Sequence, residues 1–278
     1  MKAFKHIRRS VAISSLIFVP ALEAVSRADT IVVTPSNPDG WALTTVDDTY
    51  TVNPAAGTAA FVNGPGTPPL GTGSVNLATA PGGGDGSAMV GTAALDGLPL
   101  SAITSLSYST YVTQNNGQQF PYIALSFAST GSGPADDNVI FEPPYQNPTS
   151  GNPSLPDQGA TTLTTWQGWN AVVGGWWDGN SVAGTPGSGV VSFATVLADY
   201  PNAVIADFAA PYNAFLGLEF QVGEASPSDN FNGNVDDVTI GINGADTTYD
   251  FEVPEPASAG LLLVGGATAL MRRRRRVV

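Results

Sequence analysis

The positive charge of this chain is confined to its two ends. All ten Lys and Arg residues lie within the first 27 or the last seven residues, and the single histidine is His6. Between Asp29 and Val253 the sequence has no Lys, Arg, His or Cys, but it has 21 Asp and Glu residues. A buried carboxyl group in this region therefore has no basic partner. It must be neutral, accept hydrogen bonds from backbone N–H groups, or bind a cation.

The same absence excludes several classes of function for the middle of the chain. Nucleic-acid binding needs cations that neutralise phosphates, and a P-loop needs its lysine. A Ser-His-Asp triad lacks its base, thiol catalysis lacks its thiol, and zinc sites built from Cys and His lack their ligands. We therefore expect no nucleic-acid partner, no organic cofactor and no enzymatic activity.

Composition and patterning predict an all-β fold, an antiparallel β-sandwich of the jelly-roll type. The 278 residues include 32 glycines and 22 prolines, and hydrophobic residues make up 42% against 12% charged residues, which favours a turn-rich β domain over disorder. The expected strands are residues 30–34, 101–113, 121–129, 138–143, 190–200 and 214–223, followed by a hairpin over 235–252 that turns at Asn243-Gly244. Residues 115–120 are expected to form a hairpin turn, and no helix is expected within the domain.

The N-terminus has the order of a secretory signal peptide. A basic segment with Lys2, Lys5, Arg8 and Arg9 precedes the apolar residues 11–25, and Ser26 and Ala28 place small side chains at the −3 and −1 positions of a cleavage site. We predict a signal helix over residues 1–28 and export from the cytoplasm. The alternative is an amphipathic first helix of the mature protein.

The C-terminus combines a short motif, an apolar run and a basic cluster. Val253, Pro254, Glu255 and Pro256 are followed by 15 uncharged residues, 257–271, and then by five arginines, 272–276. A helix of that length rises roughly 22 Å, so it would cross the ~30 Å hydrocarbon core only marginally, with the arginines on the cytoplasmic side. The alternative is a buried helix with a solvated basic tail.

This order resembles the PEP-CTERM sorting signal of Gram-negative bacteria. The resemblance implies an exosortase as processing partner and membrane attachment through the C-terminal helix before processing. It also implies export across the inner membrane and delivery to the cell surface or extracellular matrix. The expected organisation is a signal peptide over 1–28, a β-sandwich over 29–252 and a sorting signal over 253–278.

Residues 231–240, with the sequence FNGNVDDVTI, resemble the closing strand of laminin-G-like and concanavalin A-like domains. In those domains an aromatic residue, a glycine and an aspartate pair precede a strand near the N-terminal strand, so the resemblance implies a concanavalin A-like jelly roll. From alternation alone, Val238 and Ile240 share one buried face. Asp236 and Asp237 cannot both point inward, so we expect one of them to bond local backbone.

A tryptophan cluster is the candidate ligand-binding site. Four of the five tryptophans fall within twelve residues, and the expected binding residues are Trp166, Trp169, Trp176, Trp177, Asp178 and Asn180. Indole faces stack on sugar rings, and the polar side chains can bond hydroxyl groups, which points to extracellular polysaccharide. Adjacent strand residues point to opposite faces, so at most one of Trp176 and Trp177 lies in a sheet core. The alternative is that the cluster serves core packing and loop anchoring.

Two acidic clusters are the candidate metal sites. Calcium takes six to eight oxygen ligands, which loops of Asp, Asn and carbonyl groups supply. The expected ligands are Asp136, Asp137 and Asn138 in one segment, and Asp229, Asn232, Asp236 and Asp237 in the other. Neither segment matches an EF-hand loop, and the alternative is that these residues form turns.

These observations favour a non-catalytic exported protein that binds extracellular polysaccharide or serves as a matrix component. A calcium-dependent adhesin and a purely structural matrix protein remain alternatives. A glycosidase that uses two carboxyl groups is disfavoured, because Glu219 and Glu224 have opposite parity along a strand and two prolines follow Glu142.

Overall fold

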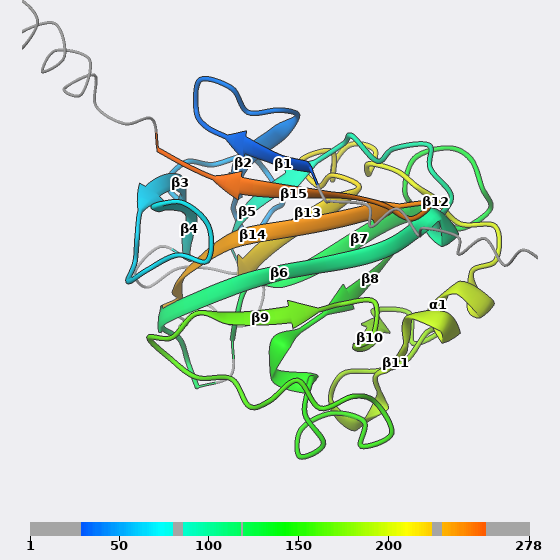
Figure 1. The fold of residues 1–278 in the computed structure, drawn as a ribbon. Coiled ribbons are helices and arrows are strands. Elements are labelled where there is room, and N and C mark those ends of the chain that lie inside the picture. The colour runs from blue at the N-terminus through cyan, green and yellow to red at the C-terminus, as the bar shows by residue number, and fades with distance from the viewer. Residues whose placement is uncertain (1–28, 80–85, 118, 224–229, 254–278) are drawn as a thin grey trace, which may run out of the picture.

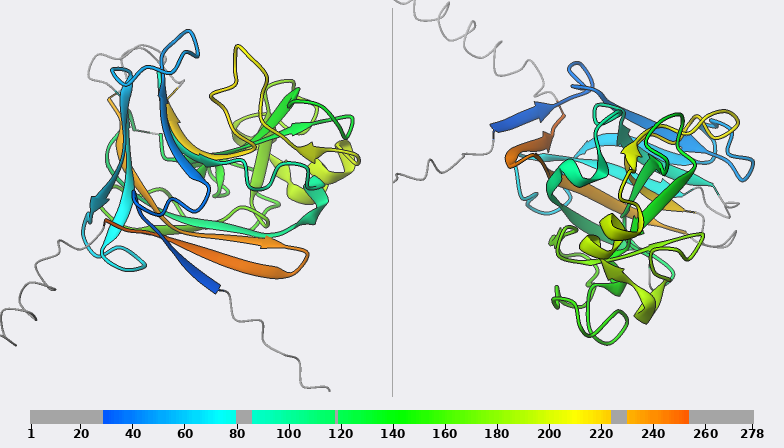
Figure 2. Two further views of the ribbon diagram at one scale, coloured as in Figure 1. Left: turned by 90° about the horizontal axis from the view of Figure 1, so that it is seen from above. Right: turned by 90° about the vertical axis from the view of Figure 1, so that its right-hand side faces the viewer.

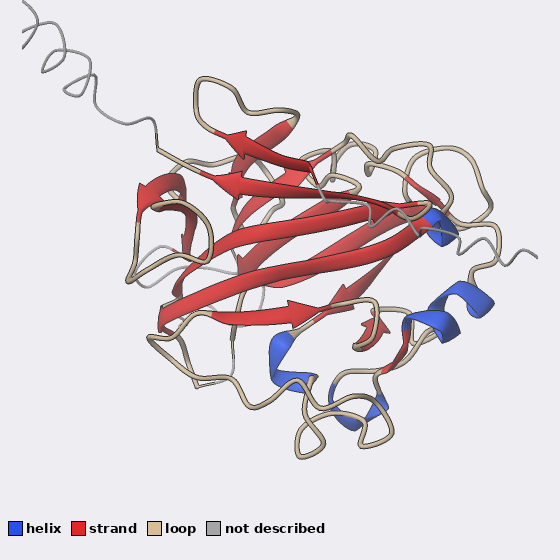
Figure 3. Cartoon of the chain, viewed as in Figure 1, coloured by secondary structure: helices blue, strands red, loops and turns tan. Residues whose placement is uncertain are grey.

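The computed structural model of the chain describes residues 29–79, 86–117, 119–223 and 230–253 (Figure 1). Within these residues two β-sheets, of seven and eight strands, pack around a shared hydrophobic core. The predicted all-β sandwich is thus confirmed at the level of fold class (Figure 3). The predicted signal helix and C-terminal membrane helix lie outside the described residues. No helix in the described part of the chain is both long enough and apolar enough to cross a membrane.

The first sheet contains the two ends of the domain. Its strands are β1 (Asp29–Val33), β3 (Gly57–Asn63), β4 (Gly73–Thr79), β6 (Ile103–Gln114), β9 (Gln167–Asn170), β14 (Asn232–Ile242) and β15 (Ala245–Phe251). The order is β1-β15-β14-β4-β3, and β6 pairs with both β14 and β9. All these pairs are antiparallel except β1 with β15, which is parallel.

The second sheet lies across the core from the first (Figure 2). Its strands are β2 (Trp41–Val46), β5 (Ser87–Thr92), β7 (Tyr122–Ala128), β8 (Asp137–Phe141), β10 (Gly175–Asp178), β11 (Val191–Ser192), β12 (Val204–Ile205) and β13 (Leu218–Gly223). The order is β11-β10-β8-β7-β13-β5-β2, with β12 paired to β7, and every pair is antiparallel. Three short 3-10 turns and one α-helix complete the described elements: η1 (Leu100–Ala102), η2 (Pro143–Tyr145), η3 (Gly187–Gly189) and α1 (Phe193–Asp199).

Alternation along the strands of the second sheet separates a core face from an outward face. In β7, Ile123, Leu125 and Phe127 are fully buried in the main core, and in β13 Leu218 and Phe220 are buried in the same cluster. Side chains of opposite parity in these strands point away from the core, because successive strand residues face opposite sides of a sheet. That outward face carries the polar residues considered below.

Residues 190–200 were expected as a strand, and this prediction is wrong. Only Val191–Ser192 form a strand, and α1 (Phe193–Asp199) follows directly. Ser192 is the N-cap, and its Oγ accepts a hydrogen bond of 3.2 Å from the backbone N–H of Thr195. Phe193, Val196 and Tyr200 are buried at helical spacing, so the apolar period in this segment is that of a helix.

The hairpin expected at residues 115–120 is also wrong. Strand β6 belongs to the first sheet and β7 to the second, so the segment between them crosses from one layer to the other. The pairing of β6 with β14 and β9 is long-range, and no local turn signal reveals it.

The final hairpin forms as predicted. Strands β14 and β15 pair around Asn243 and Gly244, whose φ angles of 52° and 85° suit a type I′ turn. Val238 and Ile240 are both buried, as alternation requires. Asp236 points inward and accepts hydrogen bonds from the N–H groups of Phe251 at 3.1 Å and Leu70 at 3.2 Å. The backbone that it bonds therefore belongs to the neighbouring strand and to a distant loop, and the adjacent Asp237 supplies a local backbone hydrogen bond.

Candidate functional site

The outward face of the second sheet forms a floor around a buried carboxyl group. One row of paired residues crosses the sheet from β10 to β2 and consists of Trp177, Ile140, Ala124, Glu219, Gly91 and Ala42. Glu219 is only 1% exposed, and its Oε1 accepts a hydrogen bond of 2.9 Å from the N–H of Leu216. A Cβ atom at Gly91 would lie 2.8 Å from Cγ of Glu219. Gly91 thus provides the space that Glu219 occupies.

A cleft of about 520 Å³ opens above this floor. Its polar lining comes from β7, β8, β13 and the segment after β10, and its rim comes from the turn after β2 and from residues 206–217. The lining residues are Tyr50, Ala124, Ser126, Asn138, Asn180, Phe208, Tyr212, Phe215, Glu219 and Gln221. The cleft therefore combines aromatic rings with hydroxyl, amide and carboxyl groups, as small-molecule and glycan sites do.

Aromatic rings form the rim of this cleft. The ring of Tyr50 meets those of Tyr212 and Phe215 edge-on, with centroids 5.0 Å and 5.9 Å apart. Tyr50 and Tyr212 remain 38% and 44% exposed. Phe208 contacts Tyr212 in the same manner at 6.5 Å. These rings hold one another in place through edge-on contacts while part of their surface stays exposed, so they are preorganised to contact a ligand.

Two aspartates hold the segments that carry these rings. Oδ1 of Asp47 accepts hydrogen bonds from Thr49 N at 3.0 Å and Thr49 Oγ1 at 2.7 Å, and hydrogen bonds from Thr49 and Asn53 lower the pKa of Asp47 to about 2. Oδ1 of Asp207 accepts a bond of 2.7 Å from Gly217 N, which closes the base of the 206–217 loop. Burial raises the pKa of the neighbouring Asp96 to about 6, and the charge of Asp207 adds to this rise.

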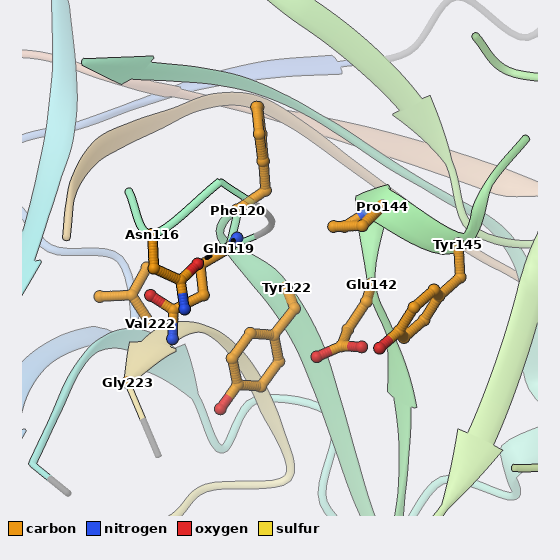
Figure 4. Close-up of a pocket in the computed structure, with 9 residues that line it drawn as sticks. All are labelled: Asn116, Gln119, Phe120, Tyr122, Glu142, Pro144, Tyr145, Val222 and Gly223. Carbon is orange, nitrogen blue, oxygen red and sulfur yellow. Dashed lines mark hydrogen bonds between the residues drawn. The ribbon is translucent and has the colours of Figure 1, made fainter. Parts of the chain in front are cut away.

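A second, smaller hollow of about 280 Å³ lies on the same face (Figure 4). It is lined by Asn116, Gln119, Phe120, Tyr122, Glu142, Pro144, Tyr145, Val222 and Gly223. Nε2 of Gln221, a cleft residue, donates a hydrogen bond of 2.5 Å to the hydroxyl oxygen of Tyr122. Since β7 and β13 are adjacent strands, this bond joins the cleft to the hollow.

Oε1 of Gln221 is a buried polar atom on this face without a hydrogen-bond partner. Nε1 of Trp177 is also buried, and its N–H group interacts with the Glu142 carboxyl group. Burial raises the pKa of Glu142 to about 7, and the Trp177 indole N–H opposes that rise. Unsatisfied buried polar groups are few in folded proteins, and they commonly mark positions where water or a ligand binds.

The predicted tryptophan platform does not exist as a surface. Trp169 and Trp176 are 2% and 0% exposed and belong to the main core. Their indole N–H groups are satisfied internally, by Thr110 Oγ1 at 2.8 Å and by the carbonyl oxygen of Ala171 at 2.7 Å. Neither ring can stack on a ligand, so core packing is the correct interpretation for both. The expectation that at most one of Trp176 and Trp177 enters the core is confirmed.

The other four predicted ligand residues are divided between structural positions and the outward face. Trp166 anchors a loop through a bond of 2.9 Å from Nε1 to the carbonyl oxygen of Pro65. Asp178 is buried, and its carboxyl group accepts bonds from Ala183 N at 2.6 Å and the Tyr200 hydroxyl at 2.9 Å. Trp177 packs on the floor beside Ala124, and Asn180 lines the cleft.

The described residues among the predicted calcium ligands lie in or beside strands of two separate sheets. Asp136 accepts bonds from Ser129 N at 2.8 Å and Ser129 Oγ at 2.9 Å. Oδ2 of Asp137 lies 2.7 Å from the hydroxyl oxygen of Tyr200, which shares its one proton between Asp137 and Asp178. Asn138 lines the cleft. On the first sheet, Asn232 accepts a bond of 2.8 Å from Asn76.

Asp236 and Asp237 complete the second acidic cluster within the described residues. Asp236 is fully buried, whereas Asp237 is partly buried and has a φ of 56° at a register shift in β14. Asp229 lies outside the described residues, as do Pro254, Glu255 and Pro256 of the sorting motif, while Val253 is partly buried. Among the residues that the structure describes, no three or more His, Cys, Asp or Glu side chains are grouped to hold a metal ion.

The rim and hollow residues were not predicted from the sequence. Tyr50, Tyr212 and Phe215 come from separate loops with no shared motif. One signal was present: Glu219 and Gln221 alternate with apolar residues in a strand that is otherwise buried, which marks polar side chains on a covered face. Comparison of the whole chain with protein families, curated proteins and solved structures finds no match.

Proposed function

We propose that this chain is an exported, surface-delivered, non-catalytic protein whose β-sandwich binds an extracellular polysaccharide of neutral or weakly charged sugars. One observation carries the proposal: the outward face of the second sheet holds a cleft with an exposed aromatic rim and a floor of amide, hydroxyl and carboxyl groups. The site thus replaces the tryptophan cluster as the basis of the polysaccharide hypothesis.

The chemistry of the cleft suits sugars. The rings of Tyr50 and Tyr212 offer flat apolar surface for the C–H faces of a sugar ring. Ser126, Asn138 and Asn180 supply hydroxyl and amide groups that both donate and accept hydrogen bonds, as hydroxyl-rich ligands require. The small side chain of Ala124 in the floor leaves room for a ligand above it.

Charge supports the choice among polysaccharides. The region from Asp29 to Val253 has no basic side chain and 21 acidic ones, so strongly anionic polymers are repelled unless cations bridge them. Glu219 is the one acidic side chain among the described residues that line the cleft. Glycoside hydrolysis requires two carboxyl groups on opposite sides of the scissile bond, which favours a binding protein over a glycosidase.

The two ends of the chain support the proposed location of the protein at the cell surface. The basic, apolar and small-residue order of residues 1–28 supports export, and the Pro-Glu-Pro motif, apolar run and arginines of residues 253–278 support processing by an exosortase at the membrane. Delivery to the surface of a Gram-negative bacterium would place the cleft among extracellular polymers. The two-sheet architecture suits the proposed concanavalin A-like relationship, although fold alone does not fix function.

A glycan array probed with the full chain, with and without Ca²⁺, tests the proposal. We expect saturable binding to neutral or weakly charged glycans that is weakened by Tyr212→Ala, because that ring is exposed on the rim. Trp166→Phe is the matched control, since Trp166 is an aromatic loop anchor that lines neither hollow. Flat binding in both conditions would identify a matrix protein without a glycan ligand and reject the proposal.

A further inference from the structure

The smaller hollow places one carboxyl group between aromatic rings. Glu142 follows the last residue of β8, and the turn η2, which begins with Pro143 and Pro144, brings Tyr145 back beside it. The N–H of Tyr145 donates a hydrogen bond of 3.1 Å to the carbonyl oxygen of Glu142. Figure 4 shows the Glu142 carboxyl group between the rings of Tyr122 and Tyr145.

The carboxyl group has no basic partner in the described protein. No Lys, Arg or His occurs between Asp29 and Val253, so a salt bridge within the described residues is excluded. Burial raises the pKa of Glu142 to about 7, and its charge contributes to the raised pKa values of Tyr108 and Tyr145. An ionised carboxylate in such a place is costly until a cation compensates it.

The residues around Glu142 distinguish between a metal ion and an organic ammonium group as the compensating cation. A metal ion would need several oxygen ligands, and Glu142 is the one carboxylate among the described residues that line the hollow. Aromatic faces, in contrast, attract an ammonium group through the ring quadrupole, and a carboxylate beside them adds direct charge pairing. The hollow therefore fits an organic ammonium group better than a metal ion.

We propose that this hollow binds the protonated amine of an amino sugar, carried by the same polysaccharide that occupies the neighbouring cleft. The inference rests on the proposed function and specifies its substrate as a polymer with free amino groups. The bond from Gln221, which lines the cleft, to Tyr122, which lines the hollow, places the two sites side by side, within the reach of one sugar chain. The acidic domain as a whole attracts such a polymer.

Pairs of oligosaccharides that differ only in N-acetylation test the inference. Isothermal titration calorimetry with the full chain would compare glucosamine and galactosamine oligomers with their N-acetylated counterparts. We expect the free amines to bind about tenfold more tightly, the scale of one charge-assisted contact. Glu142→Gln should abolish this preference and leave binding of the N-acetylated oligomers unchanged.

Two further variants separate the hollow from general attraction to an acidic protein. Asp199→Asn removes the same charge from an exposed position on α1, and it should retain the preference for free amines. Tyr145→Leu keeps the carboxylate but removes one ring, and it should reduce the preference about threefold through loss of the cation–π contact. Circular dichroism melting curves would confirm that each variant is folded.

Each outcome decides a specific point. Equal affinity for free and acetylated amines would overturn the inference and leave the polysaccharide cleft intact. Loss of the preference in Asp199→Asn as well as in Glu142→Gln would show long-range attraction and would also overturn it. An oligolysine peptide that binds as tightly, with the same dependence on Glu142, would assign the hollow to a protein partner instead. Absence of binding to every oligosaccharide would reject the proposed function itself.

Discussion

Replacing Asp236 with asparagine should change how the stability of the sandwich depends on pH. Asp236 lies fully buried in β14, where it accepts hydrogen bonds from the N–H groups of Leu70 and Phe251. Burial is the largest cause that raises its pKa, from 3.8 to about 7, and the charge of Asp250 also raises it. The three backbone hydrogen bonds, including one from Asp237, act in the opposite direction.

The magnitude follows from linkage between protonation and folding. A pKa that is about 3 units higher in the folded state corresponds to ~4 kcal/mol of unfolding free energy. The folded protein binds this proton more tightly than the unfolded chain, so the stabilisation is complete below pH 3.8 and is lost as the pH rises to about 7. Between about pH 5 and pH 8 the expected loss is ~2–3 kcal/mol.

Urea unfolding of the wild-type chain and of Asp236→Asn across that pH range measures this quantity. Asparagine keeps an acceptor for one N–H group but does not titrate, so the stability advantage of the wild type should shrink by ~2–3 kcal/mol from about pH 5 to pH 8. The comparison holds even if the variant is less stable throughout, because only the change with pH matters. Asp199→Asn, at an exposed site, should show a flat difference. A flat difference for Asp236→Asn as well would refute the argument that this carboxyl group is buried and unpaired with any base.

Four other measurements test the fold and the site. Gly91→Ala should lower the melting temperature and weaken glycan binding, because the new Cβ would lie 2.8 Å from Cγ of the buried Glu219. Gly168→Ala is the control: its new Cβ would have no neighbour closer than 3.8 Å, so neither property should change. Trp176→Ala should cost about 3–5 kcal/mol of unfolding free energy in urea titrations, and glycan affinity of the folded fraction should not change. Tyr212→Ala should leave the melting temperature within a degree or so and reduce glycan affinity about tenfold, which calorimetry would show. Thermal melts in EDTA test whether Asp136 is a turn residue or a calcium ligand. Its hydrogen bonds to Ser129 indicate a turn residue, so the melting temperature should not change in EDTA, whereas loss of a bound calcium ion would lower it.

Local signals in the sequence were sufficient for fold class and for several strands. Alternation placed Val238 and Ile240 on one buried face, and Asn243-Gly244 marked the turn of the last hairpin. These features depend on neighbours within a few residues, where side-chain parity and φ preferences act directly. The spacing of Phe193, Val196 and Tyr200 was an equally local signal, and it is the spacing of a helix where a strand was predicted.

The site depended on contacts that no local pattern encodes. Trp169 lies between the exposed residues Gly168 and Asn170, and Trp176 is followed by the partly buried Trp177. Pairing of their strands within the two sheets nevertheless directs the rings of Trp169 and Trp176 into the core. The cleft instead gathers Tyr50 and Tyr212, which are far apart along the chain.

The sequence by itself determined the charge problem: a domain with no basic residue from Asp29 to Val253 must satisfy its buried carboxyl groups through backbone or through ligands. Only the tertiary structure decided which buried carboxyl groups are bonded by backbone N–H groups and which are left for a ligand. Tertiary contacts gave Asp236 the N–H group of Phe251 in a neighbouring strand and that of Leu70 in a loop, but left Glu142 beside two aromatic rings in an open hollow. The reason is physical: charge is a property of composition, whereas burial and partnership depend on which distant strands pair.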